Sequence, residues 1–150
     1  MRLEESSSID VTCESDPCEE KTHFKIRAPN FRDLETANDT AGMISPLGYS
    51  VAKRQKERAD AILRGEDPPE LEFNEDERKA LNVLSRWVRD RNTALVVQCL
   101  TGADNKNFST PHEVEQFLLK LRPLDCVRDV IDELANKIEN LDNSSKKKNS

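Results

Sequence analysis

Residues 110–121, TPHEVEQFLLKL, carry the clearest structural signal in the chain. Thr110 can cap a helix, Pro111 suits the first helical position, and Glu113 stands where a capping box has its acid. The apolar residues that follow recur at the spacing of one helical face: Val114, Phe117, Leu118 and Leu121. The stretch therefore predicts an amphipathic helix, which Arg122-Pro123 ends.

The flanking sequence repeats this helical pattern. Further helices are predicted over residues 50–64, 74–91, 93–102 and 125–141. Their starts carry capping residues, among them Asn74 with Glu77 at the third position, Thr93 and Asp125. No segment reads as a sheet strand, and residues 103–109 read as a polar loop. We therefore predict an all-α fold, a small bundle of four to five short helices.

The first 45 residues differ from this bundle. They mix polar and acidic residues with scattered single apolar ones, which predicts a disordered acidic N-terminal arm over 1–45 before a helical domain over 46–141 and a polar basic tail over 142–150. Residues 1–20 hold seven acids and one base, so the rest of the 150-residue chain has 22 of each. A neutral remainder argues against a phosphate-binding surface spread over the fold, and the acidic arm indicates a basic protein partner.

The sequence offers little for catalysis or metal binding. It has two histidines and four glycines, and it lacks the phosphate-cradling and nucleophile motifs of common enzyme classes. Cys13, Cys18 and His23 form the one metal-like cluster, but a closed zinc site needs four ligands. We expect no enzyme activity, no metal and no cofactor. Without an apolar run of about 20 residues or a leader-like start, we expect an intracellular chain whose four cysteines are thiols.

The arm contains one short apolar patch. Ile9 and Val11 alternate with Asp10 and Thr12, as in an extended segment that adds to the edge of a partner's sheet. Burying both apolar side chains contributes roughly 3 to 6 kcal/mol, against an ordering cost of about 1 to 2 kcal/mol per residue. Acids around the patch would steer it to a basic rim. Phosphorylation would add charge at the candidate sites Ser6, Ser7 and Ser8.

Residues 9–15, IDVTCES, resemble a SUMO-interacting motif, and particularly those of SUMO-targeted ubiquitin ligases. The resemblance implies an extended strand in a groove of SUMO, with the binding residues Ile9, Asp10, Val11, Thr12 and Glu14. Ser8 stands where the family usually has another apolar residue, which favours binding assisted by phosphorylation. The cysteine and histidine pattern of a RING ligase domain is missing.

Residues 74–138 are similar to the harmonin-homology domain. The similarity rests on ALNVLSRWVRDRN (80–92), TALVVQCL (93–100) and PHEVEQFLLKLRPL (111–124), followed by an amphipathic last helix. Members of that family bind partner helices or peptides, so the resemblance implies an interaction domain. The candidate aromatic residues for a partner groove are Trp87, Phe108 and Phe117.

The sequence thus predicts a non-enzymatic adaptor, nuclear or alternatively cytoplasmic, that binds SUMO or SUMOylated proteins through its arm and another protein through its helical domain. Two alternatives stay open. The first is a nucleic-acid-binding helical domain with an acidic autoinhibitory arm, based on Lys53, Arg54, Lys56 and Arg58. The second is a homo-oligomerising scaffold.

Overall fold

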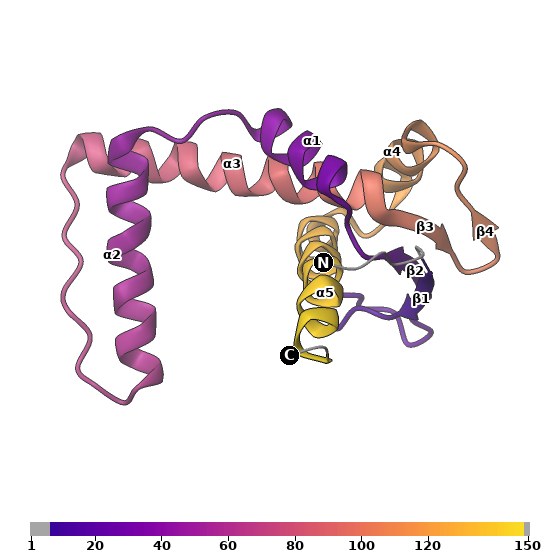
Figure 1. Cartoon of the computed structure of the whole chain (residues 1–150), viewed down its shortest axis with the longest axis horizontal. Coiled ribbons are helices and arrows are strands. Elements are labelled where there is room, and N and C mark those ends of the chain that lie inside the picture. The colour runs from indigo at the N-terminus through magenta and orange to yellow at the C-terminus, as the bar shows by residue number, and fades with distance from the viewer. Residues whose placement is uncertain (1–6, 149–150) are drawn as a thin grey trace. The chain divides into compact units, whose positions relative to one another are not determined.

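The computed structural model describes residues 7–148, with side chains as far as Leu141. The elements in chain order are β1 (Ser8–Val11), β2 (Phe24–Arg27), α1 (Phe31–Ala41), α2 (Pro46–Leu63), α3 (Glu75–Cys99), β3 (Leu100–Ala103), β4 (Lys106–Asn107), α4 (Pro111–Lys120) and α5 (Leu124–Lys148) (Figure 1). The fold is mixed α/β, so the all-α prediction is wrong. α5 also continues beyond the expected helix end at residue 141.

The chain divides into two compact units. One consists of residues up to 40 together with those from 91 on, and it holds the sheet, α4 and α5. The other consists of residues 41–90 and holds α2 and most of α3. α3 is one continuous helix of 25 residues that passes from the second unit into the first.

The sheet has four antiparallel strands in the order β1-β2-β3-β4. In β1, Ile9 lies opposite Ile26 of β2, and in β2, Phe24 lies opposite Ala103 of β3. Two strands and α1 therefore come from the segment for which disorder was predicted, and that prediction is wrong. Phe24 and Ile26 alternate with Lys25 and are almost fully buried, which is the period-two pattern of a half-buried strand.

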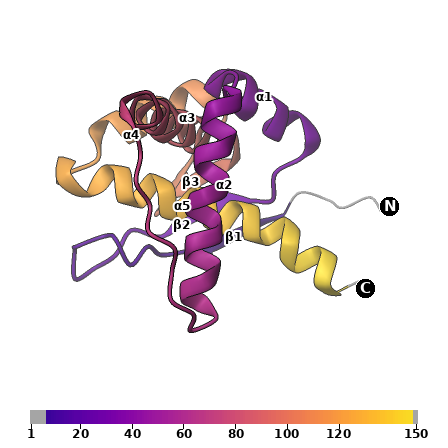
Figure 2. The same cartoon turned by 90° about the vertical axis from the view of Figure 1, so that its left-hand side faces the viewer.

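The core of the first unit lies between the sheet and the helices. α5 packs against β2, and helix and sheet lie side by side in both views (Figure 1, Figure 2). Leu134 and Ile138 of α5 are fully buried, as are Leu95 and Val96 near the end of α3. The apolar faces predicted for the last helices thus close over strands that the sequence pattern did not reveal.

The β3–β4 hairpin replaces a predicted helix end and loop. Thr93 does not begin a new helix, because α3 runs through it to Cys99. Gly102, expected to stop a helix, lies in β3, where a Cβ atom would stand only 2.6 Å from the carbonyl oxygen of Lys106. Asp104 turns the chain with a positive φ of 51°, a conformation that aspartate tolerates better than most residues.

Two predicted helix starts are confirmed. At α3, the Glu77 nitrogen donates to Asn74 Oδ1 at 2.9 Å and the Asn74 nitrogen donates to Glu77 Oε1 at 3.1 Å, a reciprocal capping box. At α4, Thr110 Oγ1 accepts from the Glu113 nitrogen at 3.3 Å. These two helix starts could be predicted because each cap depends only on residues three positions apart.

In the second unit, Val51 and Ala61 of α2 are buried. Arg54 pairs with Glu77 and lies over the Phe73 ring, 4.5 Å from its centroid.

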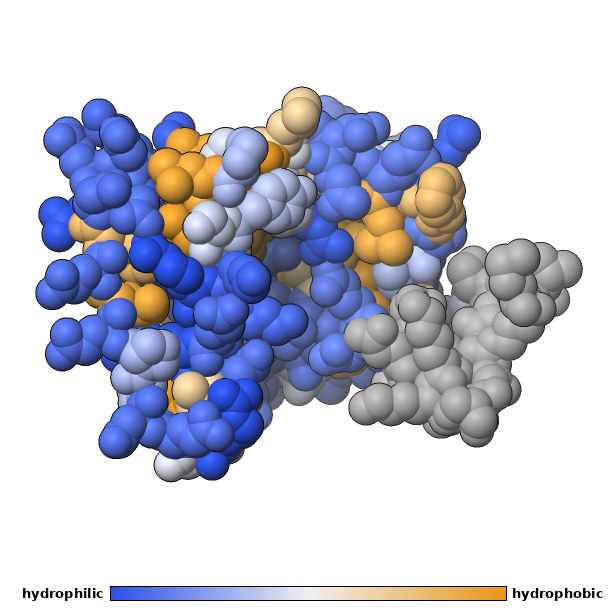
Figure 3. All heavy atoms as spheres, turned by 60° about the vertical axis from the view of Figure 1, so that its left-hand side comes forward, coloured by the Kyte–Doolittle hydropathy of each residue, from blue (hydrophilic) through white to orange (hydrophobic). Residues whose placement is uncertain are grey.

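On the face drawn in Figure 3, hydrophobic side chains form separate patches among hydrophilic ones. No helix in the described part of the chain has the length and apolar character needed to cross a membrane.

Candidate functional site

The first candidate site is the outer edge of β1. The strand order puts β1 at one end of the sheet, and no other strand among residues 7–148 pairs with its outer side. Ile9 is 41% exposed, whereas Val11 is partly buried and packs against the core. Asp10 is exposed and, by the alternation of a strand, points to the other face. Thr12, just beyond the strand, is exposed as well.

A carboxylate from the last helix fastens the chain that follows β1. Glu133 of α5 accepts three hydrogen bonds: from the Glu14 nitrogen at 2.9 Å, the Ser15 nitrogen at 3.0 Å and Ser15 Oγ at 2.8 Å. Burial of this carboxylate opposes its ionisation, but the Ser15 and Glu14 hydrogen bonds and the charge of Lys137 outweigh that effect. The pKa of Glu133 is therefore below its usual range.

The next turn of chain is held by internal polar contacts. Lys21 Nζ donates to the carbonyl oxygens of Cys13 at 2.9 Å and Asp16 at 3.0 Å. The Asp16 carboxylate accepts from the nitrogens of Cys18 at 3.0 Å and Thr22 at 2.9 Å. The pKa of Asp16 is lowered because these hydrogen bonds outweigh the cost of its partial burial. β1 is thus followed by an ordered loop and is held in an extended conformation.

Of the phosphorylation candidates, Ser8 begins β1 and Ser7 precedes it. Ser6 is outside the described residues. Ser7 is exposed, and the exposed Ser8 shares a hydrogen bond of 2.8 Å between its Oγ and Oγ1 of Thr101. A phosphate on Ser8 would replace this bond with a charged group at the edge of the sheet.

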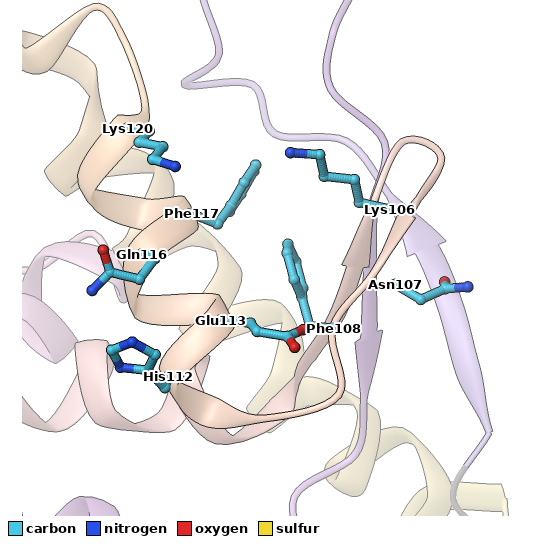
Figure 4. A pocket seen from close by; sticks show the side chains of 8 residues that line it. All are labelled: Lys106, Asn107, Phe108, His112, Glu113, Gln116, Phe117 and Lys120. Atoms are coloured by element: carbon cyan, nitrogen blue, oxygen red, sulfur yellow. The ribbon is translucent and has the colours of Figure 1, made fainter.

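The second candidate site is a hollow of about 330 Å³ between β4 and α4, at the opposite edge of the sheet (Figure 4). Two aromatic rings predicted to line a partner groove meet there: the centroids of Phe108 and Phe117 are 5.1 Å apart at an angle of 47°. Phe117 also contacts the buried Phe24 edge-on at 6.4 Å. Trp87, the third predicted aromatic, belongs to the other unit, where its Nε1 donates to the carbonyl of Gly42 at 2.8 Å.

The charged rim of this hollow was not predicted from the sequence. Lys106 and Lys120 are exposed, and Figure 4 shows both reaching toward the Phe117 ring from opposite sides. Within residues 7–141, neither ammonium group has an ion pair or hydrogen bond. The only sequence signal for Lys120 is its position three residues after Phe117 on one helix face, and nothing in the sequence joins it to Lys106.

A buried ion pair lies elsewhere in the first unit. Asp33 of α1, 5% exposed, binds both terminal nitrogens of Arg27, and Arg27 Nη2 also donates to the Gln98 carbonyl at 2.7 Å. Burial opposes ionisation of Asp33, yet its hydrogen bonds to Arg27 and Asn30 lower its pKa. Cys99 Sγ lies 3.6 Å from this carboxylate. The group joins β2, α1 and the end of α3.

The four cysteines differ in burial. Burial, together with the nearby acids Glu133 and Asp33 respectively, raises the pKa values of Cys13 and Cys99 to about 12, so both remain protonated thiols. Cys18 is exposed and Cys126 partly buried, and all four are free. Among the described residues, no group of three or more histidine, cysteine or acidic side chains could hold a metal ion.

One of the four basic residues that suggested nucleic-acid binding by α2 is already paired with an acid. Arg54 is engaged by Glu77, while Lys53, Lys56 and Arg58 are exposed. Nucleic-acid binding through this helix stays a prediction, as does homo-oligomerisation.

No protein-family model, curated protein or solved structure matches this chain. The resemblances to the SUMO-interacting motif and to the harmonin-homology domain therefore rest on the residues quoted above.

Proposed function

We propose that this chain is a non-enzymatic adaptor that binds SUMO by adding a strand to the outer edge of β1 and binds a second protein through another surface of the fold. The observation that carries the proposal is that residues resembling a SUMO-interacting motif form an edge strand. An edge strand presents unpaired backbone groups to a partner strand. The motif and the geometry it requires therefore coincide in one segment.

The ordered loop favours this function energetically. An isolated motif must be ordered when it binds, at about 1 to 2 kcal/mol per residue. β1 is already extended, because β2 pairs with it and Glu133 fastens its C-terminal end. Preorganisation of this kind improves affinity by lowering the ordering cost.

The side chains of β1 would contact SUMO in a binding mode that differs from that of an isolated motif. Ile9 is available to a partner, whereas Val11 already packs in the chain's own core. Exposed acids near the strand, Asp10, Glu14, Glu19 and Glu20, supply the negative charge expected opposite a basic rim. The proposed contact therefore uses Ile9, the strand edge and this charge.

Titration of labelled SUMO with the whole chain tests the proposal. We expect saturable binding that an Ile9→Ala variant weakens about tenfold, since roughly half of that side chain is free to contact SUMO. Leu119→Ala is the matched control, because Leu119 is an exposed apolar residue of α4. Absence of saturable binding, or equal affinity of the Ile9→Ala variant and the original chain, would contradict SUMO binding.

A second variant separates edge addition from release of the strand. Glu133→Gln loosens the attachment of the loop. If SUMO required β1 to leave the sheet and expose Val11, this variant would bind more tightly than the original chain. Edge addition predicts unchanged or weaker binding.

A further inference from the structure

We infer that the hollow between β4 and α4 binds an acidic peptide through one aromatic side chain. This inference deepens the second half of the proposed function, since it names the chemistry of the second partner. It uses the edge of the sheet opposite to β1.

The floor of the hollow suits an aromatic anchor. Phe108 and Phe117 are each half-buried, so part of each ring faces the hollow. The contact of Phe117 with Phe24 fixes the ring from behind, and the backbone nitrogen of Phe108 donates to the Thr101 carbonyl at 2.9 Å. A third ring can pack against this tilted pair in the offset or edge-on arrangement that aromatic side chains prefer.

The rim determines the charge of the partner. Lys106 and Lys120 lie at one end of the hollow, while Glu113 lies at the other end (Figure 4). Glu113 Oε2 accepts from the Ser109 nitrogen at 2.9 Å, so this acid serves the start of α4. Acidic residues on one side of the anchor would meet both ammonium groups without approaching Glu113. Charge complementarity thus favours an aromatic residue adjoining a short acidic run.

Nuclear magnetic resonance titration of the isotope-labelled whole chain tests this inference. The probes are two peptides in which one phenylalanine is either preceded or followed by three glutamates. We expect one of them to bind saturably, with a Kd of about 0.1 to 1 mM and shifts concentrated in residues 106–120. The same peptide with serine in place of phenylalanine should show at least about tenfold weaker binding.

Charge reversal on the rim is the decisive variant. Lys106→Glu/Lys120→Glu should weaken the phenylalanine peptide about tenfold, and Lys53→Glu/Lys56→Glu, an equal change at exposed positions of α2, should not. These variants are chosen because replacing Phe117 would disturb its contact with the core. No saturable shift with either probe up to about 5 mM, equal binding of the serine peptide, or undiminished binding by the rim variant would overturn the inference.

Two further readouts keep the outcomes apart. Ile9→Ala should leave peptide binding unchanged, and the rim variant should leave SUMO binding unchanged, so either function can fail without the other. A solution mass showing a dimer that the rim variant dissociates would overturn the peptide in favour of a second copy of the chain.

Discussion

Glu133 Oε1 accepts two hydrogen bonds from Ser15, one from its backbone nitrogen and one from its Oγ, across 118 positions of sequence. This relationship ties the loop behind the first strand to the last helix. The N-terminal segment is consequently part of the folded unit, and the strand edge proposed to bind SUMO is followed by a loop that Glu133 of α5 fastens.

Removing this carboxylate should destabilise the fold. In Glu133→Ala the nitrogens of Glu14 and Ser15 lose their acceptor, and we expect the free energy of unfolding to fall by about 1 to 3 kcal/mol. Urea denaturation followed by circular dichroism measures the change. Glu115→Ala, at an exposed position of α4, is the control and should stay within about 0.5 kcal/mol of the original chain. Equal stability of the two variants would show that the Glu133 contacts contribute nothing.

Acid should weaken the fold by protonating three carboxylates whose pKa values are lowered in the folded state. The pKa values of Glu133, Asp16 and Asp33 are lowered in the folded state from ordinary values of 4.5, 3.8 and 3.8. Their contribution to stability is therefore complete above those ordinary values and is lost as the pH falls through the folded-state pKa values. Urea midpoints measured between about pH 7 and about pH 3 should decline below about pH 5.

The Glu133→Gln variant provides the matched comparison for this decline. Because it removes one of the titrating groups, its urea midpoint should fall less steeply with acid than that of the original chain. Parallel curves for the two proteins would exclude Glu133 as a source of the pH dependence.

Breaking the buried Arg27–Asp33 ion pair should cost more stability than breaking a surface pair. Asp33→Asn leaves the Arg27 guanidinium partly buried opposite a neutral amide, at an expected cost of about 3 kcal/mol. Asp39→Asn, on the exposed part of the same helix, should change stability by less than about 0.5 kcal/mol. Thermal and urea denaturation of both variants test this difference, and a small effect of Asp33→Asn would mean that the pair contributes little net stability.

Thiol labelling tests whether the N-terminal segment is folded. In the native protein, the exposed Cys18 should react with a thiol reagent, although the charge of Asp16 raises its pKa, whereas Cys13 and Cys99 should react only as fast as the chain unfolds. Mass spectrometry of digested samples assigns each label. A disordered arm would instead expose Cys13, and similar native rates for Cys13 and Cys18 would contradict the sheet.

Signals carried by neighbouring residues could be read from the sequence. The Asn74–Glu77 box and the Thr110 cap involve residues three positions apart, and the α5 face recurs every three or four residues. The alternation of Ile9 and Val11 with polar residues, which indicates an extended segment, is also a local pattern. Each of these patterns is complete within one or two turns of chain, so no distant partner is needed to recognise it.

The sheet and the site depended on distant partners. Phe24-Lys25-Ile26-Arg27 has a strand's alternation, but its partner β3 lies more than 70 positions later and contains Gly102, a residue that weakens any periodic pattern. Thr93 has the side chain of a helix cap, yet α3 continues through it to the buried residues around Leu95. Glu133 and Lys106 had no local signal, and Lys120 had only its position on the helix face of Phe117, because their roles arise only when the elements pack together.

The strand order sets the spacing between the two surfaces. Three inter-strand steps of about 4.8 Å separate β1 from β4, so their backbones stand about 14 Å apart. The hydrogen-bonded strands β2 and β3 lie between the two edges and fix this separation. Partners bound at both edges would be held in one fixed mutual orientation, and pairs too bulky to share so short a span would compete with each other.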